Sequence, residues 1–300
     1  MSQATPHHTL RGILLMMSAV FMFSSMDTLV KYMLQSYPMP GLIWARYMVH
    51  MLVMLVLLWP RVGFSLLRTN RPGLQMLRGL LLVLSTMFFY FALRYLPLAE
   101  AAAISFVGPA LTTLLAGWML GDRATLKQWF AVLLGFTGVL IIIRPGGALF
   151  TPAAIFPLCT ALTFSIYQIV TRKLAGRENP HTTLFYTALV GSVLTSVALP
   201  FGWQGPTALQ GLFMVGIGLL GGFGHFLLIR AMDHASPTTL APFIYSQLLW
   251  STLLAYLAFS EFPDNGSLLG MGVIVAAGLL AIDWSQMRRR SDTADQAAHH

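Results

Sequence analysis

The amino-acid sequence predicts an all-α polytopic membrane protein, with ten transmembrane helices arranged as two five-helix inverted-topology repeats around a central cavity. Three observations support this fold class. Only 9% of the 300 residues are Asp, Glu, Lys or Arg and 56% are hydrophobic, whereas about 25% of the residues in an ordinary soluble protein are charged. Apolar runs of about 20 residues, the length of one bilayer crossing, occur ten times. Several prolines that bound these runs in the first half of the chain have counterparts about 140 positions further on in the second half.

Each expected helix is bounded by a break, usually a proline. In the first half the runs are 12–33, before Pro38; 41–59, before Pro60; 73–94, after Pro72; 97–121, starting at Pro97; and 126–143, before Pro145. In the second half they are 152–172, starting at Pro152; 181–201, after Pro180; 208–231, after Pro206; 236–259, before Pro263; and 267–287, after Pro263. All are longer and more continuous than the strands of a membrane β-barrel, so helices are the expected spanning element.

The basic residues predict the orientation of the chain, because cytoplasmic loops of membrane proteins are enriched in Lys and Arg. With the N-terminus in the cytoplasm, fourteen of the eighteen Lys and Arg residues, Arg78 among them, lie on the inner side. Lys31, Arg94 and Arg144 lie on the outer side, and Arg46 falls within a span. We therefore expect both termini to be cytoplasmic.

The two halves of the chain share a pattern. The stretch 93–122 is a Leu-Pro corner followed by an apolar helix, which is interrupted at Gly108-Pro109 and ends in Asp122. A similar stretch, 232–261, lies 139 positions further on and ends in Glu261. At a spacing of 140 positions, Pro40 and Pro60 correspond to Pro180 and Pro200.

A repeat of five spans must be inverted, because an odd number of crossings brings the second copy into the membrane from the opposite side. Inverted repeats are a recurring architecture of secondary transporters, whose substrate site lies near the midplane between the copies. We expect the first repeat at 12–147, the second at 150–287, and a disordered polar tail at 291–300.

The ten spans, the run LRYLPLAEAA with its Gly108-Pro109 break, and the echo that ends in Glu261 resemble the drug/metabolite transporter superfamily, EamA type. The resemblance covers about 12–287, and within the superfamily the chain is most similar to bacterial exporters of aromatic amino acids. It implies that the first four spans of each half surround the cavity and that the fifth is peripheral. It also implies a location in the bacterial inner (cytoplasmic) membrane.

Ionisable groups inside a span are costly and are functional candidates by default. Asp27 and Arg46 lie roughly 8–10 Å from the outer surface at about 1.5 Å rise per residue, so an ion pair between the first two spans is possible. Lys31, one turn from Asp27, is the rival partner. The pair is either structural or an outer gate that binds a carboxylate. Glu100 lies in the first turn of its span, where it is a helix cap, a gate residue or a proton carrier.

Polar and aromatic side chains recur on single faces of several spans, where they either join helices or line a cavity. His50 is expected to pack, and His225 lies among glycines that are expected to allow close helix contact. The candidate substrate-binding residues are Phe88, Tyr90, Ser105, Thr163, Tyr167, His225, Tyr245, Gln247 and Trp250.

These side chains suit a neutral or zwitterionic ligand with an apolar body. Stacking of an aromatic ligand adds about 0.5–1.5 kcal/mol for each ring pair beyond burial. A phosphorylated sugar would need Lys or Arg near the midplane of the membrane, where none is expected.

Gly108, Pro109 and Pro242 are candidate hinge residues, because proline removes a backbone hydrogen bond and permits bending. We expect the third, fourth, eighth and ninth spans to bend so that one side opens while the other closes; the alternative is a set of static kinks. Facilitated transport is the expected coupling, with proton antiport through Asp27, Glu100 or His225 left open.

The sequence thus predicts a secondary transporter that exports small amphipathic metabolites, best matched by aromatic amino acids. The alternatives are a drug or multi-metabolite effluxer and a lipid-carrier flippase of the same fold. Neither a paired-Asp nor an H-E-x-x-H arrangement is present, so an enzyme is not expected. We expect no cofactor, no metal and no nucleic-acid partner; membrane lipid surrounds a monomer or weak homodimer.

Overall fold

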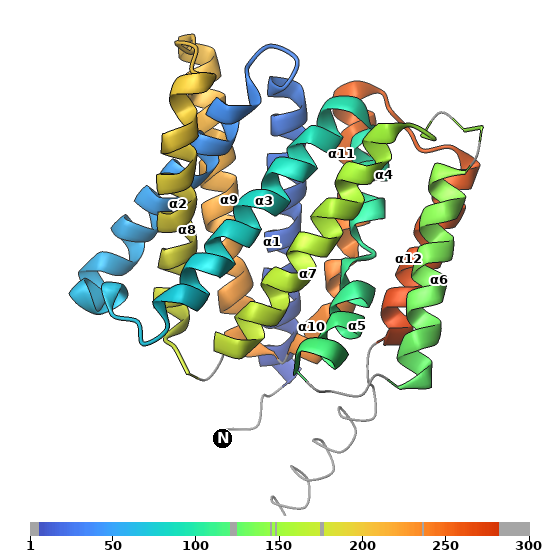
Figure 1. Cartoon of the computed structure of the whole chain (residues 1–300), viewed down its shortest axis with the longest axis horizontal. Helices are drawn as coiled ribbons and strands as arrows, with labels where there is room; N and C mark the ends of the chain where they lie inside the picture. Colours follow the sequence, from blue (N-terminus) through green and yellow to red (C-terminus); the bar gives the residue numbers. More distant parts are fainter. Residues whose placement is uncertain are drawn as a thin grey trace, which may run out of the picture.

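A computed structural model describes residues 6–120, 125–144, 146–147, 149–174, 177–235 and 237–281. Across these residues the regular secondary structure is entirely helical (Figure 1). The α-helices are α1 (Pro6–Met33), α2 (Met39–Val62), α3 (Pro72–Tyr95), α4 (Leu98–Ser105), α5 (Gly108–Leu120), α6 (Leu126–Ile143), α7 (Ile155–Leu174), α8 (Pro180–Ala198), α9 (Ala208–His234), α10 (Pro237–Ile244), α11 (Ser246–Phe259) and α12 (Asn265–Ala281). Short 3₁₀ segments are η1 (Gly63–Leu67), η2 (Pro152–Ala154) and η3 (Leu199–Phe201).

The predicted class, a helical multi-pass membrane protein, is confirmed. Seven segments of the described chain are long and apolar enough to cross a membrane: Thr9–Met33, Met39–Pro60, Pro72–Tyr95, Leu98–Ala116, Pro152–Leu174, Ala208–Met232 and Pro242–Phe259. Shorter apolar helices are Trp129–Ile143 and Asn265–Leu280. The predicted tail 291–300, Asp122 and the end of the last predicted span lie outside the described residues.

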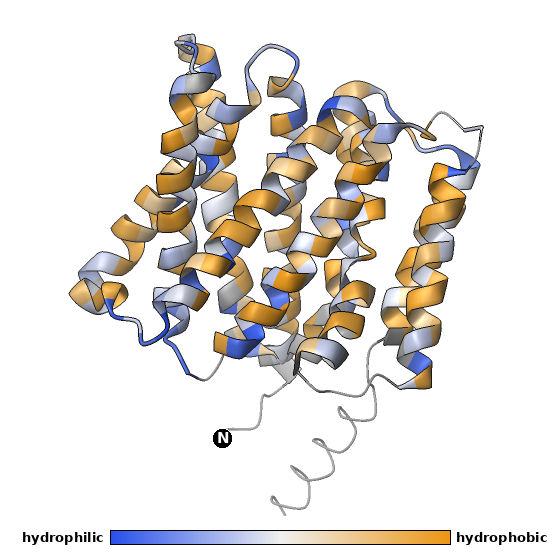
Figure 2. Ribbon diagram, viewed as in Figure 1, coloured by the Kyte–Doolittle hydropathy of each residue, from blue (hydrophilic) through white to orange (hydrophobic). Residues whose placement is uncertain are grey.

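The outer surface of the bundle is apolar, as lipid contact requires. Figure 2 shows hydrophobic residues along most of the helices and hydrophilic residues gathered at the connections between them. Val56 of α2 and Leu249 of α11 are each 73% exposed. Exposed apolar side chains in this number would be a liability in water and are expected in contact with lipid.

The helices run up and down between two ends of the bundle (Figure 1). The connections α1–α2, α3–α4, α6–α7, α8–α9 and α11–α12 lie at one end, drawn uppermost and here called the upper end. The connections α2–α3, α7–α8 and α9–α10 lie at the opposite, lower end, as do the last turn of α5 and the first turn of α6. Helices α4 and α5 follow one another in the same direction, as do α10 and α11.

The bundle is held together by a few extensive helix pairs. Helix α1 packs on α9 and α11, α2 on α8 and α9, α3 on α7 and α8, and α6 on α12. Large side chains such as Tyr47, Leu93 and Tyr90 are fully buried where these helices meet.

Glycines of α9 explain how closely it approaches its neighbours. A Cβ atom at Gly218 would lie 3.0 Å from the carbonyl oxygen of Ala45 on α2, and one at Gly221 would lie 3.1 Å from the sulfur of Met26 on α1. Both separations are tighter than ordinary van der Waals contact, so these positions have room for hydrogen only. The prediction that these glycines permit close helix contact is confirmed.

The two interrupted spans differ in where they break. The span predicted at 97–121 breaks at Phe106-Val107, between α4 and α5, directly before Gly108-Pro109. The span predicted at 236–259 continues through Pro242 and breaks at Tyr245, between α10 and α11. The expected interruption at Pro242 is therefore displaced by three residues, because proline removes a bond to the preceding turn without ending the helix that follows it.

Candidate functional site

The interior between α1, α2, α3 and α9 contains a group of polar side chains, here called the central cluster: Asp27, Arg46, His50, Tyr90 and His225. Arg46 and His50 lie one turn apart on α2 and so face the same way. Asp27, His50 and Tyr90 are 5%, 3% and 0% exposed. Four of the five were predicted as site residues, and His50 was expected only to pack.

The two histidines of the central cluster stack on each other. Their ring centroids are 5.3 Å apart and the planes differ by 5°. Phe23 of α1 meets the ring of His225 edge-on, with centroids 4.9 Å apart. The approach of Phe23 depends on the small residues of α9, since a Cβ atom at Gly224 would lie 2.7 Å from the Phe23 ring.

Arg46 is surrounded by aromatic rings. Its guanidinium lies 5.7 Å from the ring centroid of Tyr47 and 5.8 Å from that of Tyr90, distances at which a cation is attracted to the face of a ring. The Tyr47 hydroxyl is 2.8 Å from the hydroxyl of Thr86 on α3. Arginine is suited to this position because its planar group both stacks on rings and binds a carboxylate with two parallel hydrogen bonds.

The predicted ion pairs of Asp27 do not form. Asp27 and Arg46, both in the described chain, interact electrostatically but do not approach to ion-pair distance. The rival partner, Lys31, binds Glu261 instead, with Nζ 2.7 Å from Oε2. Sequence spacing along one helix could not reveal a partner 230 positions away.

One polar atom of the central cluster, His50 Nε2, is buried without a hydrogen-bond partner in the described chain. A buried group left unpaired costs about 1–3 kcal/mol, so such atoms are concentrated where a ligand or a mobile group completes the site. The cluster therefore combines a guanidinium, a carboxylate, several rings and unused hydrogen-bonding capacity.

Arg78 of α3 forms a second buried polar group below the central cluster. Its Nε donates to the Thr171 hydroxyl at 2.8 Å, one terminal nitrogen donates to the Thr183 carbonyl at 2.9 Å and to the Thr187 hydroxyl, and the other donates to the Tyr167 hydroxyl at 2.6 Å. The guanidinium also lies 4.5 Å from the centroid of the Tyr167 ring.

Two expectations about arginine are corrected by this arrangement. Arg78 was counted with the cytoplasmic residues, but its side chain is 6% exposed and joins α3 to α7 and α8. Of the Lys and Arg residues, only Arg46 was placed within a span, yet Arg78 also lies between the helices of the bundle. The indication was present in the sequence, because Arg78 falls inside the predicted span 73–94.

The remaining predicted substrate-binding residues do not join the central cluster. The Ser105 hydroxyl donates to Ala101 O and Pro157 O, and the Thr163 hydroxyl donates to carbonyls of its own helix. Tyr245 packs on Phe106. Trp250 meets Phe21 edge-on, and the Gln247 carbonyl accepts from Ser24, which ties α11 to α1. Phe88 is half-buried on α3.

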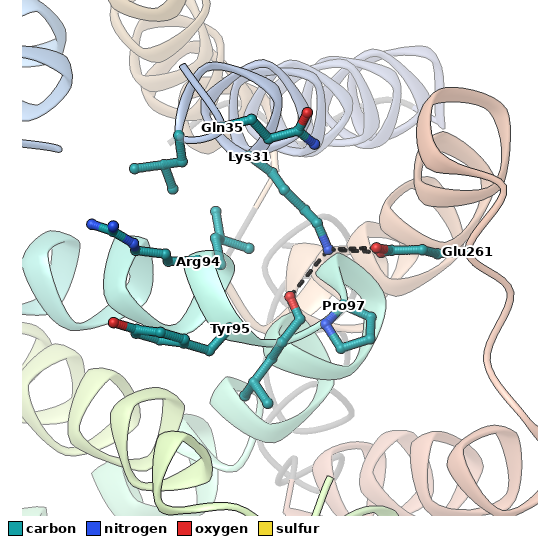
Figure 3. Close-up of a pocket in the computed structure, with 9 residues that line it drawn as sticks. Lys31, Gln35, Arg94, Tyr95, Pro97 and Glu261 are labelled. Carbon is teal, nitrogen blue, oxygen red and sulfur yellow. Dashed lines mark hydrogen bonds and ion pairs between the residues drawn. The ribbon is translucent and has the colours of Figure 1, made fainter. Parts of the chain in front are cut away.

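The upper end of the bundle is closed by Lys31 (Figure 3). Its ammonium donates to both carboxylate oxygens of Glu261, at 3.0 and 2.7 Å, and to the carbonyl of Leu96 at 3.1 Å. Glu100, a predicted gate residue, is buried and interacts electrostatically with Glu261 and Lys31. Glu261 was predicted only as the end of a helix, and neither its partner nor the pocket beside it was expected.

Comparison with known proteins agrees with this arrangement. The sequence profile described as the EamA-like transporter family matches residues 10–144 and again residues 151–282. A solved crystal structure superposes with a TM-score of 0.66 at 20% sequence identity, over 90% of this chain and 96% of that chain, so the two proteins share a fold.

Several characterised transporters are similar in sequence. The S-adenosylmethionine uptake transporter of Rickettsia bellii is 32% identical over 73% of this chain and 76% of its own length. The riboflavin transporter of Vibrio cholerae is 26% identical over 95% of this chain and 97% of its own. The pseudopaline exporter CntI of Pseudomonas aeruginosa is 28% identical over 90% of this chain and 95% of its own.

Proposed function

Because the chain belongs to the EamA-like transporter family, and is therefore a multi-pass membrane transporter of small metabolites and not an enzyme, we propose that it exports amphipathic metabolites that join an α-amino-acid head to an aromatic body. Free aromatic amino acids are the simplest members of this class. S-adenosylmethionine, which a relative takes up, also combines an α-amino-acid head with a flat ring system.

The central cluster carries this proposal. Arg46 and Asp27 are near each other but unpaired, so a zwitterion can bind between them, with its carboxylate on Arg46 and its ammonium on Asp27. Tyr47 and Tyr90 present ring faces to Arg46, and His50, one turn along α2, stacks on His225. Aromatic substrates are favoured at such a site because offset or edge-on ring contacts add to the burial of apolar area.

The helix packing supports the proposed ten spans in two inverted repeats, 12–147 and 150–287. Each predicted span has a counterpart five spans away in the other half, and the counterparts pack in the same way. The contact of α1 with α9 corresponds to that of α7 with α3, and the contact of α2 with α9 to that of α8 with α3. The contact of α1 with α11 corresponds to that of α7 with α5. The family profile also matches the chain twice. The distribution of Lys and Arg supports the proposed orientation, with the upper end outside and both termini in the cytoplasm of a bacterial cell.

The proposed mechanism is alternating access through bending at the two interrupted helices. The interior at the level of the central cluster is filled by side chains, with Tyr47 and Tyr90 fully buried, so entry of a substrate requires helices to separate. The breaks at Phe106-Val107 and Tyr245 provide points at which the halves of each span can change direction. Export is driven by the gradient of the substrate itself, and proton antiport through Asp27, Glu100 or His225 is the competing form of coupling.

Uptake into liposomes that contain the purified protein tests the function. Labelled phenylalanine and tryptophan should accumulate faster than in protein-free liposomes, and unlabelled aromatic amino acids should compete more strongly than aliphatic ones. An imposed pH gradient should leave the rate unchanged if transport is facilitated, whereas a steep dependence on the gradient identifies proton coupling. Transport of neither amino acid, in either direction, would overturn the substrate assignment.

A lipid-carrier flippase is the second candidate, and one groove favours it. A cleft of about 370 Å³ lies between α2 and α8, lined by Met48, Met51, Leu189, Ser192, Val193, Ser196 and Val197. It supplies the lateral opening that a flippase needs. Its lining contains no Lys or Arg for a phosphate, which ranks this candidate below the metabolite transporter.

A further inference from the structure

A pocket of about 440 Å³ opens at the upper end of the bundle, between the end of α1, the α3–α4 corner and the end of α11 (Figure 3). Its polar lining is Lys31, Gln35, Arg94, Tyr95 and Glu261, and its apolar lining includes Leu34 and Leu93. The pocket is separate from the central cluster, none of whose residues lines it.

The ion pair between Lys31 and Glu261, here called the closure, lies beside this pocket. It connects the end of α1 to the end of α11 and to the α3–α4 corner. All three donor positions of the Lys31 ammonium are occupied: two contacts are to the Glu261 carboxylate and one is to the Leu96 carbonyl. Glu261 directly follows Ser260, whose backbone φ is +56°. Ser260 is the one non-glycine residue of the described chain with a positive φ. Non-glycine residues in this conformation are strained and are concentrated at functional sites.

Arg94 provides the pocket with a cation that has no anion. Its side chain is exposed, and within the described chain it forms neither an ion pair nor a side-chain hydrogen bond. In Figure 3 Arg94 lies on the opposite side of Lys31 from Glu261, and its guanidinium is directed away from Lys31. Two cations and one carboxylate therefore line the pocket. This set is complementary to a carboxylate next to an ammonium once the Arg94 side chain turns toward Lys31.

We infer that this pocket is an outer binding site for the α-amino-acid head of the substrate, whose carboxylate binds Lys31 and a reoriented Arg94 side chain while its ammonium binds Glu261. The inference rests on the proposed substrate class. When the substrate binds, Lys31 and Glu261 exchange their contact with each other for contacts with the carboxylate and the ammonium of the ligand. Neither charge is left unpaired, and the connection from α1 to α11 is released. A substrate arriving at or leaving from the outer side thus opens the closure as it binds.

Protection of an introduced thiol tests this site without any need for transport. Cys159 is the only cysteine of the chain, so a Cys159→Ser background can carry Gln35→Cys in the pocket. Gly205→Cys, in the exposed α8–α9 connection with no side chain within 4 Å, is the matched control. The full-length variants are labelled with a maleimide in lipid nanodiscs, where both faces are accessible, in the presence of L-phenylalanine or of phenylalaninamide, which lacks the carboxylate.

L-phenylalanine should slow labelling at Gln35→Cys about 10-fold, phenylalaninamide should not, and neither should affect Gly205→Cys. Arg94→Gln should raise the concentration needed for half-protection about 10-fold, as expected for loss of a charge-assisted hydrogen bond. Because Arg94 is exposed, this variant is not expected to impair folding. Equal protection by the amide, or no protection at all, would overturn the outer site. Protection of the thiol without transport in liposomes would support the outer site and overturn the proposed function. Transport in liposomes without protection of the thiol would support the proposed function and overturn the outer site.

Discussion

The rings of Phe106 and Tyr245 lie with their centroids 5.4 Å apart, and each residue marks the point at which its own membrane span is interrupted. Phe106 separates α4 from α5, and Tyr245 separates α10 from α11. The two positions are 139 residues apart, the spacing at which the sequence repeats. The breaks of the two halves therefore meet in the interior of the bundle, so a bend in one span bears directly on the other.

Replacing Pro109 or Pro242 with alanine should slow transport while leaving substrate binding unchanged. At Pro242, inside α10, alanine restores a backbone N–H and stabilises a straight helix, because proline in a helix interior is about 3 kcal/mol less favourable than alanine. Pro109 lies in the first turn of α5, where alanine would allow the helix to continue back across the break. Initial rates in liposomes and equilibrium binding to the solubilised protein separate the two effects. Rates equal to those of the wild type in both variants would show that the prolines only shape the bundle.

Arg46→Gln should lower the specificity constant for a zwitterionic substrate by roughly 10- to 100-fold, the equivalent of one lost charge-assisted interaction. Arg46→Lys should recover part of this loss, because the charge is kept but the flat, two-pronged geometry is not. Arg68→Gln, at an exposed position of the lower end, is the control. An Arg46→Gln protein that transports at the wild-type rate would remove Arg46 from the substrate site.

Arg78→Leu should destabilise the protein by about 1–3 kcal/mol, since the Tyr167 hydroxyl loses its hydrogen-bond partner inside the bundle. Thermal unfolding in detergent measures the change, and Arg71→Leu at an exposed position provides the comparison. An unchanged midpoint would indicate that the hydrogen bonds of Arg78 are not formed in the resting protein.

Gly218→Ala should destabilise the protein by about 1–3 kcal/mol, because an added methyl group on α9 meets the Ala45 carbonyl and Val49 of α2 and forces the helices apart. Gly211→Ala on the same helix has no neighbour within 4 Å. It should be neutral or stabilising by up to about 1 kcal/mol, the difference in helix propensity. Equal midpoints for the two variants would contradict the close contact between α2 and α9.

The Arg144–Asp264 pair predicts a pH-dependent contribution to stability at the upper end. The hydrogen bond from Arg144, followed by that from the Ser267 N–H, holds the pKa of the Asp264 carboxyl well below its usual range. A depressed pKa gives stabilisation that is present above the unfolded-state value of about 3.9 and is lost as the pH falls through the folded-state value.

Asp264→Asn isolates the charge, because asparagine still caps α12. Its melting temperature should lie below that of the wild type at pH 7, and the difference should shrink as the pH falls below about 4. The pair is exposed, so the difference should be small and should fall in high salt. A difference that stays constant down to pH 2 would mean that the carboxylate charge is not involved.

The sequence was sufficient for those features that repeat along the chain. The scarcity of charge, the apolar runs and the prolines at their ends predicted a helical membrane protein, and the Gly108-Pro109 pair located one of the two interruptions. The glycines near His225 correctly predicted close packing of α9. Local periodicity was enough here because a lipid environment requires every backbone group to be satisfied within its own helix.

Only the tertiary structure decided which polar side chains meet. The sequence could assign Asp27 two partners on local spacing, but Lys31 pairs with Glu261 across the whole chain, Arg78 is buried among hydroxyls of α7 and α8, and His50 stacks on His225. The rotation of each helix about its own axis and its distance from its neighbours select these contacts. Both are set by side-chain packing between helices, which depends on shape at the atomic scale and leaves no periodic trace in the order of residues.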